Sequence, residues 1–227
     1  VCFDPGSHAL ISGWAEERRR SLDWGVFHVE HQFLSIWRRY QRALKQRNSL
    51  LRSYPLPADA LFLPWEAELA QTGQQIDQQR QAYLDLLRPR LARSMQGLLG
   101  ELGALELRYR RGWAEDQDLA SQLRVQREKD VARGHTTMGV HRADWTLAFE
   151  HAPLREHLSR GQGKLVALAC MLAQAELYAE HHGDWPIVCL DDLASELDQA
   201  HQRAVIGQLM GASAQILLTG TELPMAM

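Results

Sequence analysis

The sequence predicts an α/β protein with a mostly parallel sheet, flanking helices and an inserted α-helical lobe. Helices and apolar strands alternate near the C-terminus, in the order 162–180, 187–190, 199–210 and 215–219. This alternation is typical of parallel-sheet domains, and strands that are apolar throughout are typical of a sheet covered by helices on both faces. Residues 16–52 and 59–99 instead carry apolar residues at helical spacing, which predicts the helical lobe.

The first long helix is predicted over residues 16–52. Leu34, Trp37 and Leu44 recur there at helix-compatible spacing. The prolines of the following segment, 54–57, end this helix because proline cannot continue the hydrogen-bond ladder.

A second long helix is predicted over residues 59–99. Leu69, Ile76 and Tyr83 repeat every seven residues, as in helices that pack as a hairpin or short coiled coil. Pro89 lies inside this stretch and is expected to kink or interrupt the helix, since its nitrogen carries no hydrogen to donate.

The middle of the chain predicts short elements. Apolar and charged residues alternate over 105–110, which indicates a strand. A charged amphipathic helix is expected over 116–132, a glycine-bearing loop over 134–142 and a short strand around 145–149.

Composition limits the classes of function. Apolar residues make up 45% and charged residues 23% of the 227, as in soluble globular proteins. Twenty-five Lys and Arg against 28 Asp and Glu leave a net charge of −3, so any nucleic-acid surface must be local. Three cysteines are too few for a disulfide framework. No apolar run long enough for a membrane span or a secretory leader is seen, so we expect a cytoplasmic protein without a membrane partner.

The strongest chemical signal is the segment 187–198, which reads IVCLDDLASELD. Its apolar strand leads directly into two carboxylates, Asp191 and Asp192. Ligands of open α/β sheets bind at the carboxyl ends of the strands. There, one carboxylate can hold Mg²⁺ through water and a second can orient or deprotonate an attacking water. A strand that simply ends in an acidic turn is the alternative.

A second signal, Leu158-Ser159-Arg160-Gly161-Gln162, precedes the apolar helix. Backbone N–H groups at a helix N-terminus attract anions, and Arg160 adds a positive charge. An ordinary N-cap, in which Ser159 caps the helix and Gly161 relieves crowding, is the alternative.

The two segments together follow the order of the signature motif, Walker B motif and D-loop of ABC-type ATPase heads. The chain resembles the RecF family of SMC-related bacterial recombination mediators. The resemblance extends to residues 17–23, 40–48 and 139–144, the last of which reads GVHRAD where the family has Gly-Pro-His-Arg-Asp-Asp. Residues 55–100 match only as a helical pattern.

The resemblance implies an ATP and Mg²⁺ site shared between two subunits. Asp191 would order the magnesium shell, and Asp192 would be the catalytic carboxylate of a slow, DNA-stimulated ATPase. The signature residues would reach the ATP held by a second subunit; they are Ser159, Arg160, Gly161 and Gln162.

The same resemblance assigns residues to the closure of an ATP-dependent homodimer. Ser195 and Asp198 of the D-loop would lie at the interface between subunits. Thr219 or Thr221 would occupy the switch position that senses the γ-phosphate, although the histidine found there in ABC enzymes is lacking.

No Gly-x-x-x-x-Gly-Lys-[Ser/Thr] phosphate loop occurs in these 227 residues; Gly163-Lys164 lacks both the spacing and the following hydroxyl. The chain is therefore expected to be a C-terminal fragment that binds ATP very weakly and is inactive alone. Its expected domains are a head segment (1–20), a helical arm (21–103) and the C-terminal head (104–227).

A local basic face is predicted on the first long helix. Arg38, Arg42 and Lys45 share one helical face, with Arg39 and Arg47 nearby, and such charges can follow DNA phosphates. The resemblance implies double-stranded DNA next to single-stranded gaps as the ligand and a RecR-like mediator as the partner, in DNA replication, recombination, repair and the SOS response.

Two alternatives remain open at this point. One is another SMC-like ATPase of the RecN kind, against which the short helical arm argues. The other is a non-enzymatic partner-binding module whose carboxylates only end a strand.

Overall fold

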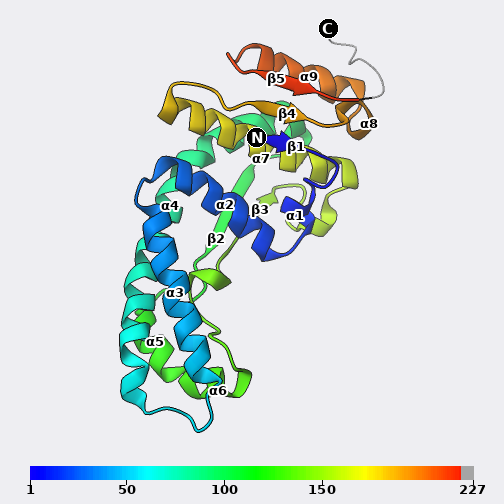
Figure 1. Cartoon of the computed structure of the whole chain (residues 1–227). Helices are drawn as coiled ribbons and strands as arrows, with labels where there is room; N and C mark the ends of the chain where they lie inside the picture. The colour runs from blue at the N-terminus through cyan, green and yellow to red at the C-terminus, as the bar shows by residue number, and fades with distance from the viewer. Residues whose placement is uncertain (221–227) are drawn as a thin grey trace. The chain divides into compact units, whose positions relative to one another are not determined.

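The computed structural model describes residues 1–220, which form two compact units (Figure 1). Unit 1 contains Val1–Ser21, Tyr83–Arg108 and the described chain from Thr146 onward, and unit 2 contains Leu22–Ala82 and Tyr109–Trp145. These two units are defined by their spatial compactness. The expected domains 1–20, 21–103 and 104–227 are defined by the segments of the family that the sequence resembles, and they stay a prediction.

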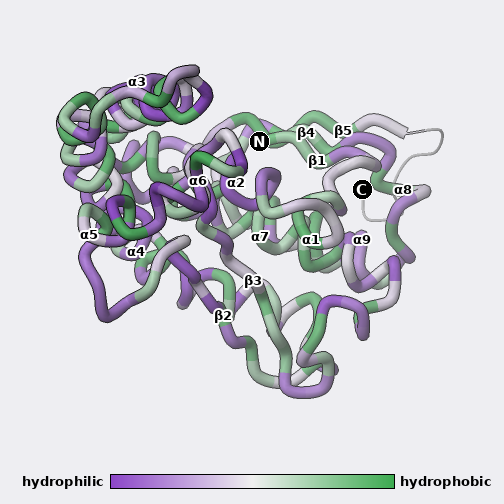
Figure 2. Tube along the Cα trace, turned by 90° about the horizontal axis from the view of Figure 1, so that it is seen from below, coloured by the Kyte–Doolittle hydropathy of each residue, from purple (hydrophilic) through white to green (hydrophobic). Residues whose placement is uncertain are grey.

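A three-stranded parallel sheet forms the centre of unit 1. Its strands are β1 (Cys2–Phe3), β4 (Val188–Leu190) and β5 (Ile216–Leu218), in the order β1-β4-β5. β4 lies in the middle, and the register pairs Leu190 with Phe3 on one side and with Leu218 on the other. The predicted parallel sheet is therefore confirmed, and Figure 2 shows its apolar character in green.

The two faces of this sheet differ in burial. Phe3, Val188 and Leu190 are buried. The opposite face carries a row of register partners, Cys2, Cys189 and Leu217, of which Cys2 is exposed and Leu217 is 50% exposed. Within residues 1–220, the expectation that both faces are covered is thus wrong, because the described helices bury only one of them.

Helices complete unit 1. Those that lie wholly within it are α1 (Ala9–Ser12), α7 (Arg160–His182), α8 (Leu193–Glu196) and α9 (Gln199–Met210). The interior of α7 is almost wholly apolar from Leu165 to Ala173, which explains why this helix is buried against the rest of the unit. α9 begins and ends at the predicted residues.

Unit 2 is mainly helical. It contains most of α2 (Ala15–Val29), all of α3 (Phe33–Leu51) and the first half of α4 (Leu63–Leu99), followed by α5 (Leu119–Val125) and α6 (Arg127–Arg133). The first predicted helix is therefore two helices separated at residues 30–32, and the helix predicted over 116–132 is also two.

Strands β2 (Leu105–Arg110) and β3 (Asp144–Phe149) lie where strands are predicted, and they pair as a separate two-stranded sheet. Helix α4 continues through Pro89 without interruption. Leu87 and Leu91 on either side of the proline are almost fully buried, and their packing holds the helix where the hydrogen bond is missing.

A buried charge network holds unit 2 together. Arg47 is completely buried and donates from Nη1 to Asp130 Oδ2 at 2.7 Å and to Thr136 Oγ1 at 2.9 Å. Its Nε donates to Glu66 Oε1 at 3.2 Å, and Nη2 donates to the Leu123 carbonyl at 2.9 Å. The guanidinium is therefore an internal brace.

No helix within residues 1–220 combines the length and apolarity that a membrane crossing requires.

Candidate functional site

The predicted acidic pair lies at the carboxyl end of the central strand β4. The backbone N–H of Asp191 donates to the Phe3 carbonyl at 2.8 Å, which fixes the strand exit against β1. Asp192 has φ of 53°, and it is the one non-glycine residue with positive φ in the described part of the chain. A side chain in this left-handed region costs conformational energy, and such residues concentrate at functional sites.

Thr219 joins both carboxylate residues. Because Leu190 and Leu218 are register partners, the residues that follow them leave the sheet side by side. Thr219 Oγ1 donates to Asp191 Oδ1 and accepts from the Asp192 backbone N–H at 3.1 Å. The structure therefore brings one predicted switch residue to the acidic pair, whereas Thr221 lies outside the described residues.

Ser195 fixes the orientation of the Asp192 side chain. Its Oγ donates to Asp192 Oδ2 and also lies 3.1 Å from the Asp192 carbonyl oxygen. Asp192 Oδ1 is buried and has no hydrogen-bond partner among the described residues. The contact of Ser195 with Oδ2 thus orients the carboxylate, while Oδ1 keeps its capacity to accept a hydrogen bond from a ligand or a water.

The acidic pair fits a magnesium ion of the kind that nucleotides carry. No group of three His, Cys, Asp or Glu side chains able to hold a metal occurs within residues 1–220. Mg²⁺ beside phosphates needs no such cage, because one or two carboxylates, phosphate oxygens and water complete its shell. Asp191, which is exposed, and Asp192, whose Oδ1 has no partner in the described part of the chain, supply such carboxylates.

Asp198 has an internal structural role. Its side chain caps α9 by accepting the His201 backbone N–H at 3.0 Å and lies 2.7 Å from His201 Nδ1. The backbone hydrogen bond from His201 is the main cause that holds the pKa of Asp198 below its ordinary value. The cap also fixes where the segment after Ser195 turns into α9.

The Ser159 tip is the N-terminus of α7 and is open to solvent. Ser159 Oγ accepts the Gln162 N–H at 3.2 Å while Gln162 Oε1 accepts the Ser159 N–H at 3.0 Å, which is a complete capping box. Gln162 Nε2 also donates to Glu101 Oε1 at 3.4 Å. Ser159, Arg160 and Gly161 are exposed, so the cap leaves the tip free to meet a ligand or a neighbouring molecule.

A cavity of about 690 Å³ opens beside the Ser159 tip. Basic side chains line it together with Ser159: Arg155, Arg160, Lys164 and His8. Arg155 Nη1 donates to the Gly13 carbonyl at 3.3 Å, which ties this wall to the chain after α1. Sequence patterns gave no signal for this cavity, because its walls come from segments about 150 residues apart.

Lys164 and Glu196 form an ion pair that sequence reasoning also missed. The Lys164 Nζ contacts Glu196 Oε2, and the two side chains are 27% and 12% exposed. This contact joins the first turns of α7 to the end of α8. In the sequence, Lys164 is considered only as a lysine that does not fit the phosphate-loop pattern.

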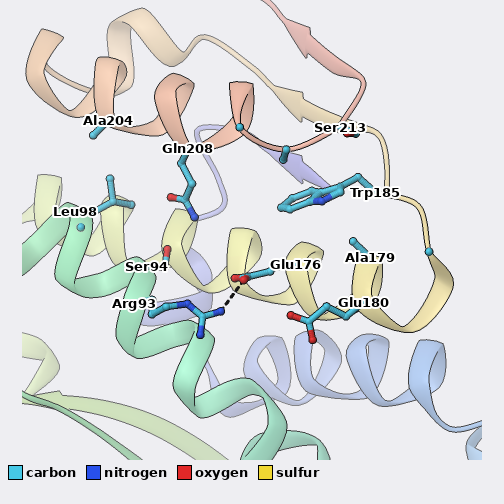
Figure 3. A pocket seen from close by; sticks show the side chains of 14 residues that line it. Arg93, Ser94, Leu98, Glu176, Ala179, Glu180, Trp185, Ala204, Gln208 and Ser213 are labelled. Atoms are coloured by element: carbon cyan, nitrogen blue, oxygen red, sulfur yellow. Dashed lines mark hydrogen bonds and ion pairs between the residues drawn. The ribbon is translucent and has the colours of Figure 1, made fainter.

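A larger cavity of about 810 Å³ lies elsewhere in unit 1, between α4, α7 and α9 (Figure 3). Trp185 and Gln208 extend into it, and an ion pair of 2.6 Å between Arg93 and Glu176 borders it. Neither the acidic pair nor the Ser159 tip lines this cavity, so it is separate from the candidate site.

The predicted basic face on α3 is partly corrected. Arg38, Arg42 and Lys45 are exposed, as a phosphate-binding surface requires. Arg39 is exposed but pairs with Glu68 through bonds of 2.7 and 3.1 Å. Arg47 is the internal brace of unit 2 and does not belong to the surface, because its side chain is completely buried.

Curated relatives match the chain over its whole length. The chain is 50% identical to the DNA replication and repair protein RecF of Stenotrophomonas maltophilia (strain R551-3) over 228 residues, which cover 100% of this chain and 62% of the relative. It is 42% identical to the RecF protein of Pseudomonas fluorescens over 217 residues. The chain therefore spans about 60% of the length of the relatives that it matches. No family model matches it.

Solved structures share the fold. A structure described as the recombination mediator protein RecF with ATP in the RecFOR pathway matches with a TM-score of 0.86 and 24% identity, over 98% of this chain and 62% of that one. A second structure, described as RecF with ATPrS, matches with a TM-score of 0.84. At this identity the likeness shows the fold alone.

Proposed function

This chain belongs to the RecF family. On that premise, we propose that it is part of a DNA replication and repair mediator that dimerises with ATP on gapped DNA. One observation carries the proposal. Within residues 1–220, the acidic pair at the sheet edge keeps one Asp192 oxygen without a hydrogen-bond partner, while the Ser159 tip is exposed on the same unit.

The acidic pair is the cis half of the proposed ATP site. Asp191 holds the water shell of a magnesium ion, which when bound neutralises charge on the phosphates. Asp192, oriented by Ser195, accepts a proton from the attacking water or positions it. Thr219 bonds to both residues and is suited to report whether a phosphate group lies against them.

The Ser159 tip is the trans half of the site. Its exposed hydroxyl, the first N–H groups of α7 and Arg160 offer donors to the phosphates bound by a second subunit. In this arrangement ATP lies between two subunits, and each subunit gives its acidic pair to one ATP and its Ser159 tip to the other. Hydrolysis then releases the dimer.

DNA is proposed to bind the exposed basic face of α3, formed by Arg38, Arg42 and Lys45. Their spacing of four and three residues aligns the three charges along the helix, as a sequence-independent phosphate contact needs. The ligand is duplex DNA beside a single-stranded gap, and a RecR-like mediator is the proposed protein partner.

Sedimentation velocity with and without ATP and Mg²⁺ tests the proposal on the complete protein that carries this chain. ATP is expected to convert monomer to dimer. Ser159→Arg places a long charged side chain on the tip and is expected to abolish dimerisation while ATP binding to the monomer persists. Dimerisation of this variant equal to that of the parent would contradict the trans role of the tip.

A further inference from the structure

The ion pair between Lys164 and Glu196 connects two segments that the proposed function assigns to different ATP molecules. Lys164 lies one turn into α7, directly behind the Ser159 tip. Glu196 follows Ser195, whose hydroxyl fixes the Asp192 carboxylate, and precedes Asp198, which caps α9. The pair therefore joins the trans half of one site to the cis half of the other within a single subunit.

The environment of the pair makes it a stiff connection. Glu196 is only 12% exposed and Lys164 only 27%, so solvent screens this contact less than it screens an open surface pair. α8 is a single turn of four residues whose backbone begins at the strained Asp192. Burial of Leu193 and hydrogen bonds from Gln202 to the Ala194 and Leu197 carbonyls also hold this element, and the charge contact at its last residue is what links it to α7 near the Ser159 tip.

The pair also determines what Lys164 can do. Its side chain lines the basic cavity at the Ser159 tip, beside Arg155 and Arg160. Because Glu196 compensates the charge of the Lys164 ammonium, that charge is not fully available to an anion in the cavity. The charge of the exposed Arg160 is available to such an anion. This division favours a positioning role for Lys164 over phosphate binding.

We propose that the Lys164–Glu196 ion pair couples the two ATP sites of the dimer, so that filling one site prepares the other. The inference rests on the proposed function. When ATP fixes the acidic pair of one subunit, Ser195 and Glu196 are fixed with it, and Glu196 holds α7 and its Ser159 tip in the position that the second site requires. Lys164 and Glu196 are thus positioning residues that contact no nucleotide.

Charge exchange in the complete protein tests the coupling. The variants are Lys164→Glu, Glu196→Lys and the double variant that carries both, and the measurement is ATP-driven dimerisation followed by sedimentation or light scattering across an ATP titration. In the parent, we expect a Hill coefficient approaching the two sites of the dimer. Each single variant is expected to lower it to the value that enclosing two ATP molecules gives by mass action alone, and to raise the half-saturating ATP concentration about fivefold, which corresponds to an ion pair at the upper end of the exposed range. The double variant is expected to restore both values.

Arg93→Gln is the matched control. Arg93 lies on α4 and forms a 2.6 Å ion pair with Glu176 of α7. The variant therefore removes an ion pair from the same helix as Lys164, at the end of α7 that is distant from the Ser159 tip. This variant is expected to keep the parental Hill coefficient. Thermal melts of all variants separate a coupling effect from loss of the fold, because a single variant that keeps the parental Tm but loses cooperativity is altered in coupling and not in folding.

The outcomes distinguish the inference from the function on which it rests. A parent protein that stays monomeric with ATP overturns the proposed function and the coupling with it. A parent that dimerises cooperatively, with Lys164→Glu unchanged in Hill coefficient, overturns the coupling alone. Single variants that lose cooperativity without recovery in the double variant also overturn it, because the pair would then have no role as a pair.

Discussion

The molecule uses carboxylates in opposite ways in its two units. In unit 2, Glu66 and Asp130 are at most 1% exposed, and each of their four oxygens has a partner; Arg47, Arg127 and Thr137 are the donors. In unit 1, Asp191 is exposed and Asp192 keeps one oxygen without a hydrogen-bond partner among the described residues.

This difference separates a structural charge from a functional one. A buried carboxylate with every oxygen bonded has no capacity for a ligand, and its removal leaves a partner charge without compensation. A carboxylate held by one oxygen at the edge of a sheet can still bind a ligand, and the fold depends on it little. Residue type and charge are the same in both units, so burial and bonding decide the role.

The largest effect is expected from Arg47→Met. Removing the guanidinium leaves Asp130 buried without its cation and Glu66 with Arg127 as its remaining cation, which should lower the free energy of unfolding by about 3–5 kcal/mol. Urea unfolding measures it. Arg42→Met, on the same helix but exposed, is the control and should stay within about 0.5 kcal/mol of the parent. Equal losses in the two variants would refute the structural role of Arg47.

Asp192→Asn is expected to lower ATP turnover of the complete protein about 100-fold, the lower range for a lost general base. Stability should change little, because asparagine also tolerates the left-handed backbone of this position. A steady-state ATPase assay beside a thermal melt gives both values.

Asp184→Asn, an exposed carboxylate in the loop before β4, controls for the loss of one charge and should keep parental turnover. Turnover of Asp192→Asn equal to that of the parent would instead favour the non-enzymatic module, in which the carboxylates only end a strand.

The basic face provides a third comparison, between free and paired charges on one helix. Reversing Arg38, Arg42 and Lys45 to Glu should weaken duplex DNA binding more than tenfold. It should also reduce the slope of log affinity against log salt by about 2.7, since each phosphate contact contributes about 0.9. Fluorescence anisotropy at several salt concentrations measures both.

Arg39→Gln is the matched control on α3. Its charge is already compensated by Glu68, so its loss should change DNA affinity by less than the loss of any one of the three free charges. An unchanged salt slope in the triple variant would move the DNA surface away from α3.

The smallest effect concerns pH and the α9 cap. Because the folded pKa of Asp198 is depressed, its contribution to stability is present above the unfolded pKa and is lost as pH falls through the folded pKa. Asp198→Ala should therefore lower Tm at pH 7, and the gap to the parent should close below about pH 4. Asp198→Asn retains a capping oxygen without the charge and should show a smaller loss at pH 7, which also closes in acid as the parent becomes protonated. A gap that widens in acid would contradict the cap.

Local patterns predicted the elements whose signals lie within a few residues. The apolar strands β4 and β5, the whole of α9 and the N-cap at Ser159 all follow from adjacent residues in the sequence. Pro89 predicted a kink or an interruption, and the interruption does not occur, since the burial of Leu87 and Leu91 that keeps α4 continuous is a tertiary property.

The candidate site was predictable only in part, for the same reason. Asp191, Asp192 and Thr219 lie at strand ends, and a parallel sheet brings such ends together. The ion pair of Lys164 and Glu196 joins residues 32 positions apart on different helices. No spacing rule connects those two positions, so the contact emerges only from packing.

The uncovered row of Cys2, Cys189 and Leu217 affects how the purified chain behaves in solution. One face of this sheet is open to solvent. An apolar strand at the edge of such a sheet is a template for pairing between molecules. Preparations of these 227 residues should accordingly become turbid at high concentration, and thiol reducing agent should be kept in every buffer, since two of the sulfhydryls lie on the open side.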